Sequence, residues 1–272
     1  VTFKAAAGNP LVSASVTAAA TGDIAATVVV FIFSVIFNNS SVYDPYWSVA
    51  PPVIAGYWIV MGFRAGTPLG IGGLLIVACL LVWAGRLTFN WARGWRGFSH
   101  EDWRYVDFRA TAGRAYWIVS FLGIHLFPTV LVFLGCLSLL PVLAEPRHSL
   151  DALWIAGVLI SATAIWIEAR ADHELFEFKK RRSDNEEILD SGLWSYTRHP
   201  NYFGEVLFWW GIYIVGLAAN PDYWWTIFGP VAITLLFLFV SVPMMERHMI
   251  ERHPSYETLR FERSRFVPWF RR

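Results

Sequence analysis

The sequence predicts an all-α, polytopic membrane protein. Of its 272 residues, 56% are hydrophobic and only 16% are charged, and the mean hydropathy is +0.43. Soluble domains carry about a quarter charged residues, so this composition argues against an ordinary soluble enzyme. It also excludes an intrinsically disordered chain, which needs low hydrophobicity and a high net charge. The 15 tryptophans are typical of a protein that meets lipid–water boundaries, where indole rings settle.

Seven apolar stretches near bilayer length predict seven membrane-spanning helices. They cover residues 24–37, 47–63, 69–89, 116–143, 150–168, 202–219 and 224–244, and the first is short enough that an earlier start is an alternative. The second stretch holds Pro51 and Pro52, which would kink or delay its start. The fourth contains Pro128, which a membrane helix can tolerate. We expect residues 1–23, rich in small residues, to form a loose lead-in, and residues 24–272 to form one membrane domain.

The distribution of cations predicts the orientation. Of the 22 lysines and arginines, all except Lys4, Arg64 and Arg147 fall within residues 86–114, 170–198 and 247–272. Seven spans place these three segments on one face, which the positive-inside rule makes cytoplasmic. The N-terminus is then outside and the C-terminus cytoplasmic, in a bacterial inner membrane or the endoplasmic reticulum. The stretches near 93–114 and 251–272 mix aromatic and charged residues, so we expect amphipathic segments lying on that face.

The sequence gives no support for a nucleic-acid-binding surface, a metal site or a dinucleotide-binding glycine motif. A net charge of +1 provides no field that would draw nucleic acid. Cys79 and Cys136 lie in apolar runs, and no histidine pair has a metal-ligand spacing on a helix, so we expect no metal site. The glycines of residues 70–73 lie within a span and indicate close helix packing, not a dinucleotide fingerprint. His125, alone in the fourth span, is expected to be a hydrogen-bonded interior residue.

The densest polar group lies at residues 192–205, at the start of the sixth predicted span. Pro200 suits the first turn of a helix, and the amides of a helix N-terminus can hold an anion. Asn201 and Glu205 are four residues apart and share a helix face, with Arg198 and His199 adding positive charge. A carboxylate one turn inside a spanning helix is costly, which favours a functional role over a structural Glu–Arg pair.

Two further polar groups fall at the ends of the fifth and third spans. Glu168, Asp172 and Lys179 lie near one helix face, and Lys179 with Lys180 could meet phosphates. Arg86, Asn90 and Arg93 share another face. A salt-bridged helix end and simple interfacial anchoring are the alternatives for these two groups. Because all three groups converge on one membrane face, they favour a phosphate-bearing cofactor that reaches a lipid-soluble substrate.

Three motifs carry a family resemblance. They read Asp44-Pro45-Tyr46-Trp47-Ser48, Glu101-Asp102-Trp103-Arg104-Tyr105 and Arg198-His199-Pro200-Asn201-Tyr202. From residue 44 to the end, the chain resembles a poorly characterised branch of the steroid 5-alpha-reductase family. Its C-terminal region is also similar to sterol C14-reductases and to phospholipid and isoprenylcysteine methyltransferases. The resemblance to the reductases implies an NADPH cavity on the cytoplasmic side and hydride delivery to an electron-poor C=C bond.

The resemblance also implies site residues. Glu205 would be catalytic, with Tyr46, Tyr57 or Asp44 as the source of an acid, while Asn201 and Glu205 would touch the nicotinamide amide. Asp172 and Lys179 would contact the adenine–ribose–phosphate portion. The predicted cofactor-binding residues are Arg86, Asn90, Arg93, Asp172, Lys179, Lys180, Trp194, Tyr196, Arg198, His199, Asn201, Tyr202 and Glu205.

One departure bears on the substrate. The steroid enzymes carry a Gln-Glu pair on the second span, whereas residues 47–52 here have none, and Trp83 lies near the place of a partner tyrosine. The resemblance therefore supports the cofactor site and argues against a steroid 3-ketone.

Three functions remain open at this point. The first is an NADPH-dependent membrane reductase acting on the C=C bond of a lipid-soluble, steroid-like or isoprenoid compound. The second is an S-adenosylmethionine-dependent membrane methyltransferase of a lipid or prenylated substrate, and the third is a lipid-binding or scaffold protein without activity. The cations near residues 172–182 favour the first, because S-adenosylmethionine has no phosphate. The expected partners are the substrate and membrane lipids.

Overall fold

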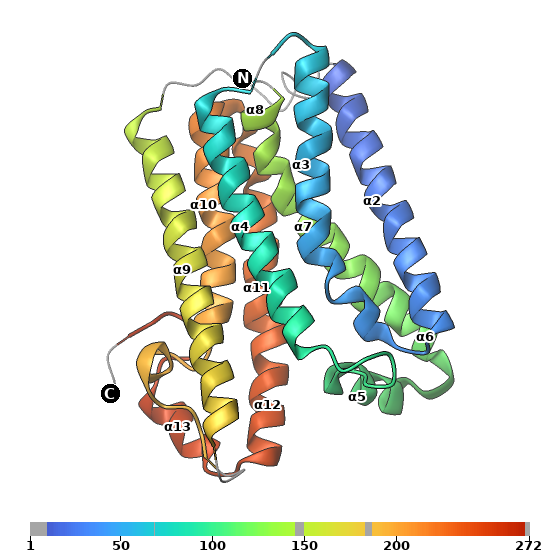
Figure 1. Ribbon diagram of the computed structural model, residues 1–272, viewed down its shortest axis with the longest axis vertical. Helices are drawn as coiled ribbons and strands as arrows, with labels where there is room; N and C mark the ends of the chain where they lie inside the picture. The colour runs from blue at the N-terminus through green and yellow to red at the C-terminus, as the bar shows by residue number, and fades with distance from the viewer. Residues whose placement is uncertain (1–9, 68, 145–149, 183–186, 270–272) are drawn as a thin grey trace.

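The computed structural model describes residues 10–67, 69–144, 150–182 and 187–269. In these ranges the regular secondary structure is helical, apart from an isolated parallel bridge between Thr197 and Ser264. Figure 1 shows long helices packed side by side, with shorter helices gathered at one end of the bundle.

The long helices follow the predicted spans in order. They are α2 (Pro10–Ile36), α3 (Tyr46–Arg64), α4 (Ile71–Gly94), α9 (Ala152–Arg181) and α10 (Pro200–Ala219). A broken rod joins α6 (Tyr116–Val119), a π-helical turn (Ser120–Leu126), α7 (Phe127–Cys136), a 3₁₀ turn (Leu137–Leu139) and α8 (Leu140–Leu143). Another rod joins η6 (Pro221–Ile227), α11 (Phe228–Leu236), a π-helical turn (Phe237–Ser241) and α12 (Val242–Arg252).

The π-helical turns have a local cause. Each directly precedes a segment with a proline near its start, Pro128 in α7 and Pro243 in α12. Proline removes a backbone N–H donor, and local changes of helix type absorb the lost hydrogen bond without ending a membrane helix.

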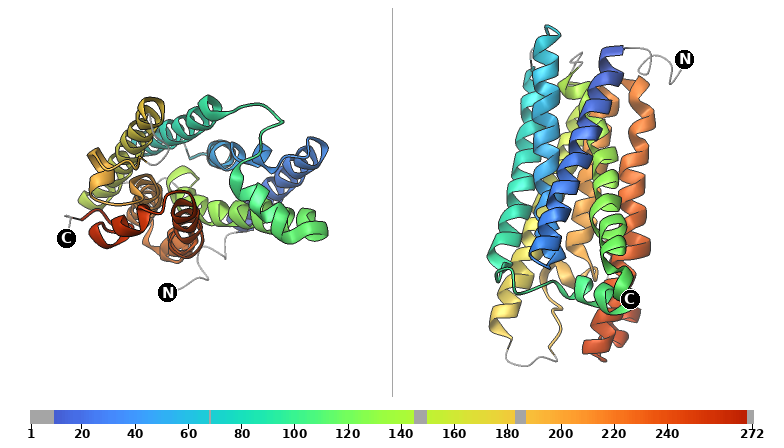
Figure 2. Two further views of the ribbon diagram at one scale, coloured as in Figure 1. Left: turned by 90° about the horizontal axis from the view of Figure 1, so that it is seen from below. Right: turned by 90° about the vertical axis from the view of Figure 1, so that its right-hand side faces the viewer.

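The shorter helices lie at the end of the bundle where the predicted basic segments meet (Figure 1). They are η1 (Ser40–Tyr43), α5 (Trp103–Ala112), η5 (Gly192–Ser195) and α13 (Tyr256–Glu262). Two of them, α5 and α13, fall within the segments 93–114 and 251–272 that were predicted to be amphipathic. The view from below in Figure 2 shows α5 and α13 on different sides of this end.

The molecule is an all-α, polytopic integral membrane protein, as predicted. Among the described residues, six helical rods are long and apolar enough to cross a bilayer. They are Ser13–Ile36, Ile71–Gly94, Trp103–Leu143, Ala152–Arg181, Pro200–Ala219 and Pro221–Arg252. The 19-residue α3, which is absent from that set, packs against α2 and α4. The count of seven spans and the cytoplasmic orientation stay predictions.

The predicted loose lead-in is wrong for residues 10–23, which form the start of α2. The hydroxyl of Thr17 donates to the carbonyl of Ser13 at 2.9 Å, and that of Thr21 donates to the carbonyl of Thr17 at 2.8 Å. Small residues whose polar groups are satisfied within the helix can therefore extend the first span. Residues 1–9 lie outside the described part of the chain.

Other predicted boundaries also move. Helix α3 begins at Tyr46 and includes Pro51 and Pro52, so these prolines do not delay its start. Helices α4 and α9 run on to Gly94 and Arg181, five and thirteen residues beyond the predicted ends. Apolar runs mark only the part of a helix that meets lipid, whereas polar helix ends continue beyond it.

Close packing between α9 and α10 sets the geometry of the site. A Cβ at Gly211 would lie 2.3 Å from the hydroxyl oxygen of Ser161, and a Cβ at Gly204 would lie 2.3 Å from Cγ of Glu168. Only glycine permits backbones to approach this closely, as in other membrane helix pairs. The contact at Gly204 brings the Glu168 side chain against the first turns of α10.

Candidate functional site

Two cavities meet at the end of the bundle that carries the short helices. The larger, of about 1290 Å³, is lined by residues from the ends of α4, α9 and α12 and from the loops around α5 and α13. We call it the basic cavity, because Arg93, Arg96, Lys179, Lys180, Arg182 and Arg252 are among its lining residues. The smaller, of about 580 Å³, is called the inner cavity and extends along α4, α9 and α10 to Glu205 and Trp209.

The two cavities share a wall. Asn90, Asp102, Asp172, Asn201 and Tyr202 line both of them. These residues come from α4, the loop before α5, α9 and α10. A ligand lying across this wall could place a charged portion in the basic cavity and another portion in the inner cavity.

Arg86 joins two carboxylates from α9 at this wall. Its Nη1 donates to Oδ2 of Asp172 and its Nη2 to Oε2 of Glu168, each at 2.6 Å. The exposed fractions of the three side chains are 13%, 11% and 2%, so the ion pairs are largely shielded from solvent. A desolvated guanidinium that holds two carboxylates fixes their positions much more firmly than a surface pair would.

Two amides and a second arginine extend the network toward the basic cavity. Asn90 Nδ2 donates to Asp172 Oδ2 at 3.1 Å, and Asn201 Nδ2 donates to Asp172 Oδ1 at 3.4 Å. Arg93 Nε donates to Asn90 Oδ1 at 2.9 Å, and its guanidinium lies 4.2 Å from the ring centroid of Phe176. The network therefore runs from the basic cavity to the inner one.

Glu205 lies in the inner cavity and is 5% exposed. Its two carboxylate oxygens accept from separate indoles, Oε2 from Trp83 Nε1 at 3.0 Å and Oε1 from Trp209 Nε1 at 2.8 Å. The Trp83 ring stacks on Phe208 with a centroid separation of 4.9 Å and an interplanar angle of 1°. Packing thus holds the indole donor in place, and the carboxylate has a fixed orientation.

Arg198 and His199 turn toward α12 and the C-terminal segment. Arg198 forms an ion pair of 2.7 Å with Glu246 and also donates to the carbonyls of Arg260 and Arg263. The His199 ring stacks on Tyr202, and its Nε2 lies 3.5 Å from Glu246 Oε1. Both residues line the basic cavity, but these contacts show that Arg198 serves a structural role as well.

The surroundings of His199 disfavour the positive charge that was expected there. Burial lowers the pKa of His199 below its ordinary value of 6.5, despite the neighbouring carboxylate of Glu246. Burial thus favours the neutral form of the ring.

The remaining predicted residues divide between the cavities and the surface. Lys179, Lys180 and Trp194 line the basic cavity, and Trp194 Nε1 donates to the carbonyl of Ala171 at 3.0 Å. Tyr196 is 46% exposed and lines neither cavity. The structure therefore does not bring Tyr196 to the proposed cofactor site.

The two predicted catalytic tyrosines also lie away from the cavities. Tyr46 donates its hydroxyl to Asp23 Oδ1 on α2 at 2.5 Å, and neither Tyr46 nor Tyr57 is a lining residue. Tyr46 belongs to the motif of residues 44–48, but its side chain points at α2. The structure gives no support to either tyrosine as the acid.

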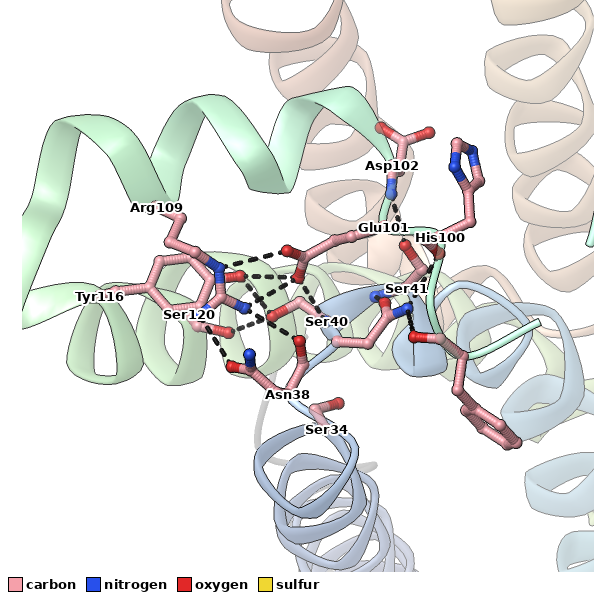
Figure 3. A network of polar contacts seen from close by, with 12 residues as sticks. Ser34, Asn38, Ser40, Ser41, His100, Glu101, Asp102, Arg109, Tyr116 and Ser120 are labelled. Carbon is pink, nitrogen blue, oxygen red and sulfur yellow. Dashed lines mark hydrogen bonds and ion pairs between the residues drawn. The ribbon is translucent and has the colours of Figure 1, made fainter. Parts of the chain in front are cut away.

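The loop before α5 is held by a polar network at the α2–α3 junction (Figure 3). The backbone N–H of Ser40 donates to Glu101 Oε1 at 2.7 Å, and Ser41 Oγ accepts from the backbone N–H of Asp102 at 2.8 Å. Arg109 on α5 pairs with Glu101 at 3.2 Å. This network fixes the part of the wall to which Asp102 belongs.

Asp102 remains a carboxylate at this wall. Burial alone would raise the pKa of Asp102, but the Arg104 guanidinium outweighs burial and keeps the pKa below its ordinary value. Arg104 Nε donates to Asp102 Oδ1 at 2.7 Å. An ionised Asp102 faces both cavities.

Sequence reasoning missed the structural partners of the site. Trp209 was not singled out, although it lies four residues after Glu205 and donates to it. Glu246 was also missed, because it lies two residues beyond the last predicted span, whereas helix α12 continues past it. In the described residues, no group of three or more His, Cys, Asp or Glu side chains could hold a metal ion.

The fold and cavities define a class: a polytopic helical membrane protein with a polar, cationic cavity at one membrane face that adjoins an apolar one. The profile of a family described as "Protein of unknown function (DUF1295)" matches residues 30–263. The chain belongs to that family.

Named relatives point to the steroid 5-alpha-reductases. The chain is 26% identical over 259 residues to "Uncharacterized protein C594.04c" of Schizosaccharomyces pombe. The aligned residues cover 86% of this chain and 74% of that protein. It is 38% identical over 58 residues to steroid 5-alpha-reductase DET2 of Gossypium hirsutum, covering 21% of this chain and 22% of the relative.

A third relative is 3-oxo-5-alpha-steroid 4-dehydrogenase 1 of Macaca fascicularis. It is 28% identical over 121 residues, which cover 42% of this chain and 40% of the relative. The chain therefore matches less than half the length of either named reductase. No solved structure matches the chain. Over these segments the chain is similar to steroid 5-alpha-reductases.

Proposed function

We propose that this protein is an NADPH-dependent membrane reductase that reduces a C=C bond of a lipid-soluble substrate. The observation that carries the proposal is the shared wall, where a cationic cavity meets a partly apolar one across Asn90, Asp172 and Asn201. Similarity to a steroid 5-alpha-reductase and to a 3-oxo-5-alpha-steroid 4-dehydrogenase supports an oxidoreductase.

The residues of the basic cavity fit a dinucleotide with several phosphates. Its volume of about 1290 Å³ exceeds the upper range, about 1000 Å³, of ordinary small-molecule sites. Exposed Lys179 and Lys180 offer ammonium groups, and Arg93 offers a guanidinium. His253 also lines this cavity, and its buried Nδ1 has no hydrogen-bond partner among the described residues.

The wall residues would hold the other end of the dinucleotide. Asn201 and Glu205 would meet its carboxamide, and Asp172 would accept from a sugar hydroxyl. Arg86 keeps Asp172 and Glu168 in place, while Trp83 orients Glu205. When bound, the cofactor supplies a hydride, and these side chains orient it and exclude water.

The inner cavity suits an apolar substrate. Its lining includes Trp47, Leu87, Phe127, Leu131, Ile233, Leu236 and Phe237. A volume of about 580 Å³ accommodates a compact lipid-soluble molecule such as an isoprenoid or steroid-like enone. These apolar side chains favour a substrate that partitions into the bilayer.

Ligand-induced thermal stabilisation in detergent tests the proposal. At a hundredfold excess over the dissociation constant, a ligand that binds only the folded state contributes about 2.7 kcal/mol. We expect NADPH to raise the melting temperature, and S-adenosylmethionine to have no effect. A response to S-adenosylmethionine alone would instead favour a membrane methyltransferase.

Matched variants locate the binding site. Lys179→Ala removes a cation that lines the basic cavity, whereas Arg181→Ala removes a nearby exposed cation that does not line it. We expect the first variant to weaken the NADPH response and the second to retain it. Equal NADPH responses in Lys179→Ala and Arg181→Ala would mean that the phosphates bind outside the basic cavity. Normal NADPH binding by Asn201→Ala would mean that Asn201 does not contact the carboxamide.

A further inference from the structure

A carboxyl–phenol pair lies in the inner cavity, away from the network around Arg86. The hydroxyl of Tyr105 on α5 donates to Oδ1 of Asp44, which follows η1. Both residues line the inner cavity, and Tyr105 is 6% exposed. The proposed cofactor contacts do not use this pair.

The polar groups of the inner cavity come from two sides of the bundle. Arg86, Glu168 and Glu205 belong to α4, α9 and α10, whereas Asp44 and Tyr105 belong to the α2–α3 junction and α5. Figure 1 shows α9 and α10 on one side of the bundle and α5 with this junction on the other. A substrate in the cavity can thus meet one polar set on the cofactor side and another on the far side.

We propose that Tyr105, with Asp44 behind it, donates the proton to the carbonyl oxygen of an electron-poor C=C substrate. This assignment rests on the proposed reductase function, which supplies the hydride. The sequence suggested Tyr46, Tyr57 or Asp44 as the source of an acid, and of these three the structure places only Asp44 at a cavity. The pair at Asp44 and Tyr105 fills that role from a different element.

The proton balance of the step is simple. Hydride addition to the β-carbon breaks the C=C π bond and places the electron pair on the carbonyl oxygen. The Tyr105 hydroxyl turns from Asp44 to that oxygen and transfers its proton, so the phenol O–H bond breaks as the enol O–H bond forms. Protonated Asp44 then donates its proton to the phenolate. The resulting enol rearranges to the saturated carbonyl, so the substrate gains one hydride and one proton while the dinucleotide is oxidised. Solvent water then returns the proton to Asp44.

The surroundings of Asp44 suit this cycle. Burial raises the pKa of Asp44 to about 6, against opposing contributions from Arg104 and the Tyr105 hydroxyl and a raising one from Asp102. Arg104 Nη2 lies 3.9 Å from Asp44 Oδ1 and can balance the carboxylate after proton transfer. Tyr43 also faces Asp44, and burial raises its pKa, so it stays neutral. The carboxyl can therefore exchange its proton near neutral pH.

A second aspartate–tyrosine pair provides a matched control. Tyr46 donates to Asp23 at 2.5 Å, and Asp23 is 7% exposed, but neither residue lines a cavity. Substitution at Asp23 therefore removes a buried carboxyl of the same kind without touching the inner cavity.

Infrared spectroscopy of the full chain in detergent tests the proposal without turnover. The probe is carvone, a lipid-soluble cyclic enone. Hydrogen bonding to Tyr105 is expected to shift the carvone carbonyl band to lower frequency in the wild type and in Asp23→Asn. Tyr105→Phe should reverse the shift. A carbonyl band at the same frequency in the wild type and in Tyr105→Phe overturns the assignment.

The second measurement follows the carboxyl band of ligand-free protein with pH. We expect a component with a midpoint near pH 6 that is lost in Asp44→Asn, retained in Asp23→Asn and shifted in Tyr105→Phe. A spectrum unchanged by Asp44→Asn overturns the role of Asp44. Failure of NADPH to stabilise the wild type would overturn the reductase function, and the two infrared measurements would still report on the pair itself.

Discussion

The indole of Trp83 donates to Oε2 of Glu205 at 3.0 Å and stacks on Phe208. This contact ties α4 to α10 at the inner end of the site. We infer that Trp83 orients the carboxylate.

Trp83→Phe tests that orientation. Phenylalanine keeps much of the stacking but removes the donor, and an unsatisfied buried acceptor costs about 1–3 kcal/mol. We expect a lower melting temperature and weaker NADPH stabilisation. Trp58→Phe is the control, because the buried Nε1 of Trp58 has no hydrogen-bond partner among the described residues. Equal losses of NADPH binding in both variants would contradict the role of Trp83.

Arg86 is expected to hold the wall together. Removing one partner of a buried ion pair typically costs about 3–5 kcal/mol, because the remaining charge is uncompensated. Arg86→Met leaves Glu168 and Asp172 without their shared partner, so we expect a strongly lowered melting temperature. Arg170→Met is the control, since Arg170 is 54% exposed and pairs with Glu174 on the helix surface. The control should lose less than about 1 kcal/mol.

Much of this wall was visible in the sequence. The spacing of Arg86, Asn90 and Arg93 predicted a shared helix face, and the structure places all three at the cavities. The spacing of Asn201 and Glu205 predicted a second shared face, and both residues line the inner cavity. Helical periodicity determines such faces locally, so they can be derived before any tertiary structure is known.

Helical periodicity could not predict which side chains on other helices contact these faces. Arg198 was expected beside Asn201 and Glu205, yet it pairs with Glu246, 48 residues away. Tyr46 was expected near the substrate but pairs with Asp23. Both outcomes depend on how helices pack, which neither hydropathy nor spacing determines. The extension of α2 to Pro10 was missed because small residues give a weak apolar signal.

The glycine contact between α9 and α10 should control stability and site geometry together. Gly211→Ala would push a methyl group against Ser161, whose backbone nitrogen lies 2.8 Å from the added Cβ position. Overpacking of this kind costs about 1–3 kcal/mol, so the melting temperature should fall. Gly56→Ala on α3 is the control, because nothing lies within 4 Å of its added Cβ. A melting temperature unchanged in both variants would mean that the helix pair is looser than described.

The C-terminal segment should depend on Glu246. This carboxylate holds Arg198, which in turn donates to the carbonyls of Arg260 and Arg263. Glu246→Gln keeps the shape but removes the charge, so Arg198 loses its buried counter-ion. We expect faster backbone hydrogen exchange across residues 256–269 and a weaker NADPH response, because the same segment borders the basic cavity.

Glu251→Gln is the matched control for that experiment. Glu251 is 64% exposed and lies 3.8 Å from Arg247, so its loss removes only a solvent-screened pair. Hydrogen exchange in the C-terminal segment should stay at the wild-type rate in this variant. If Glu246→Gln also exchanges at the wild-type rate, the isolated bridge between Thr197 and Ser264 and the hydrogen bond from Thr197 to the Phe266 carbonyl suffice to hold the segment. In that case Arg198 would be free to serve the cofactor.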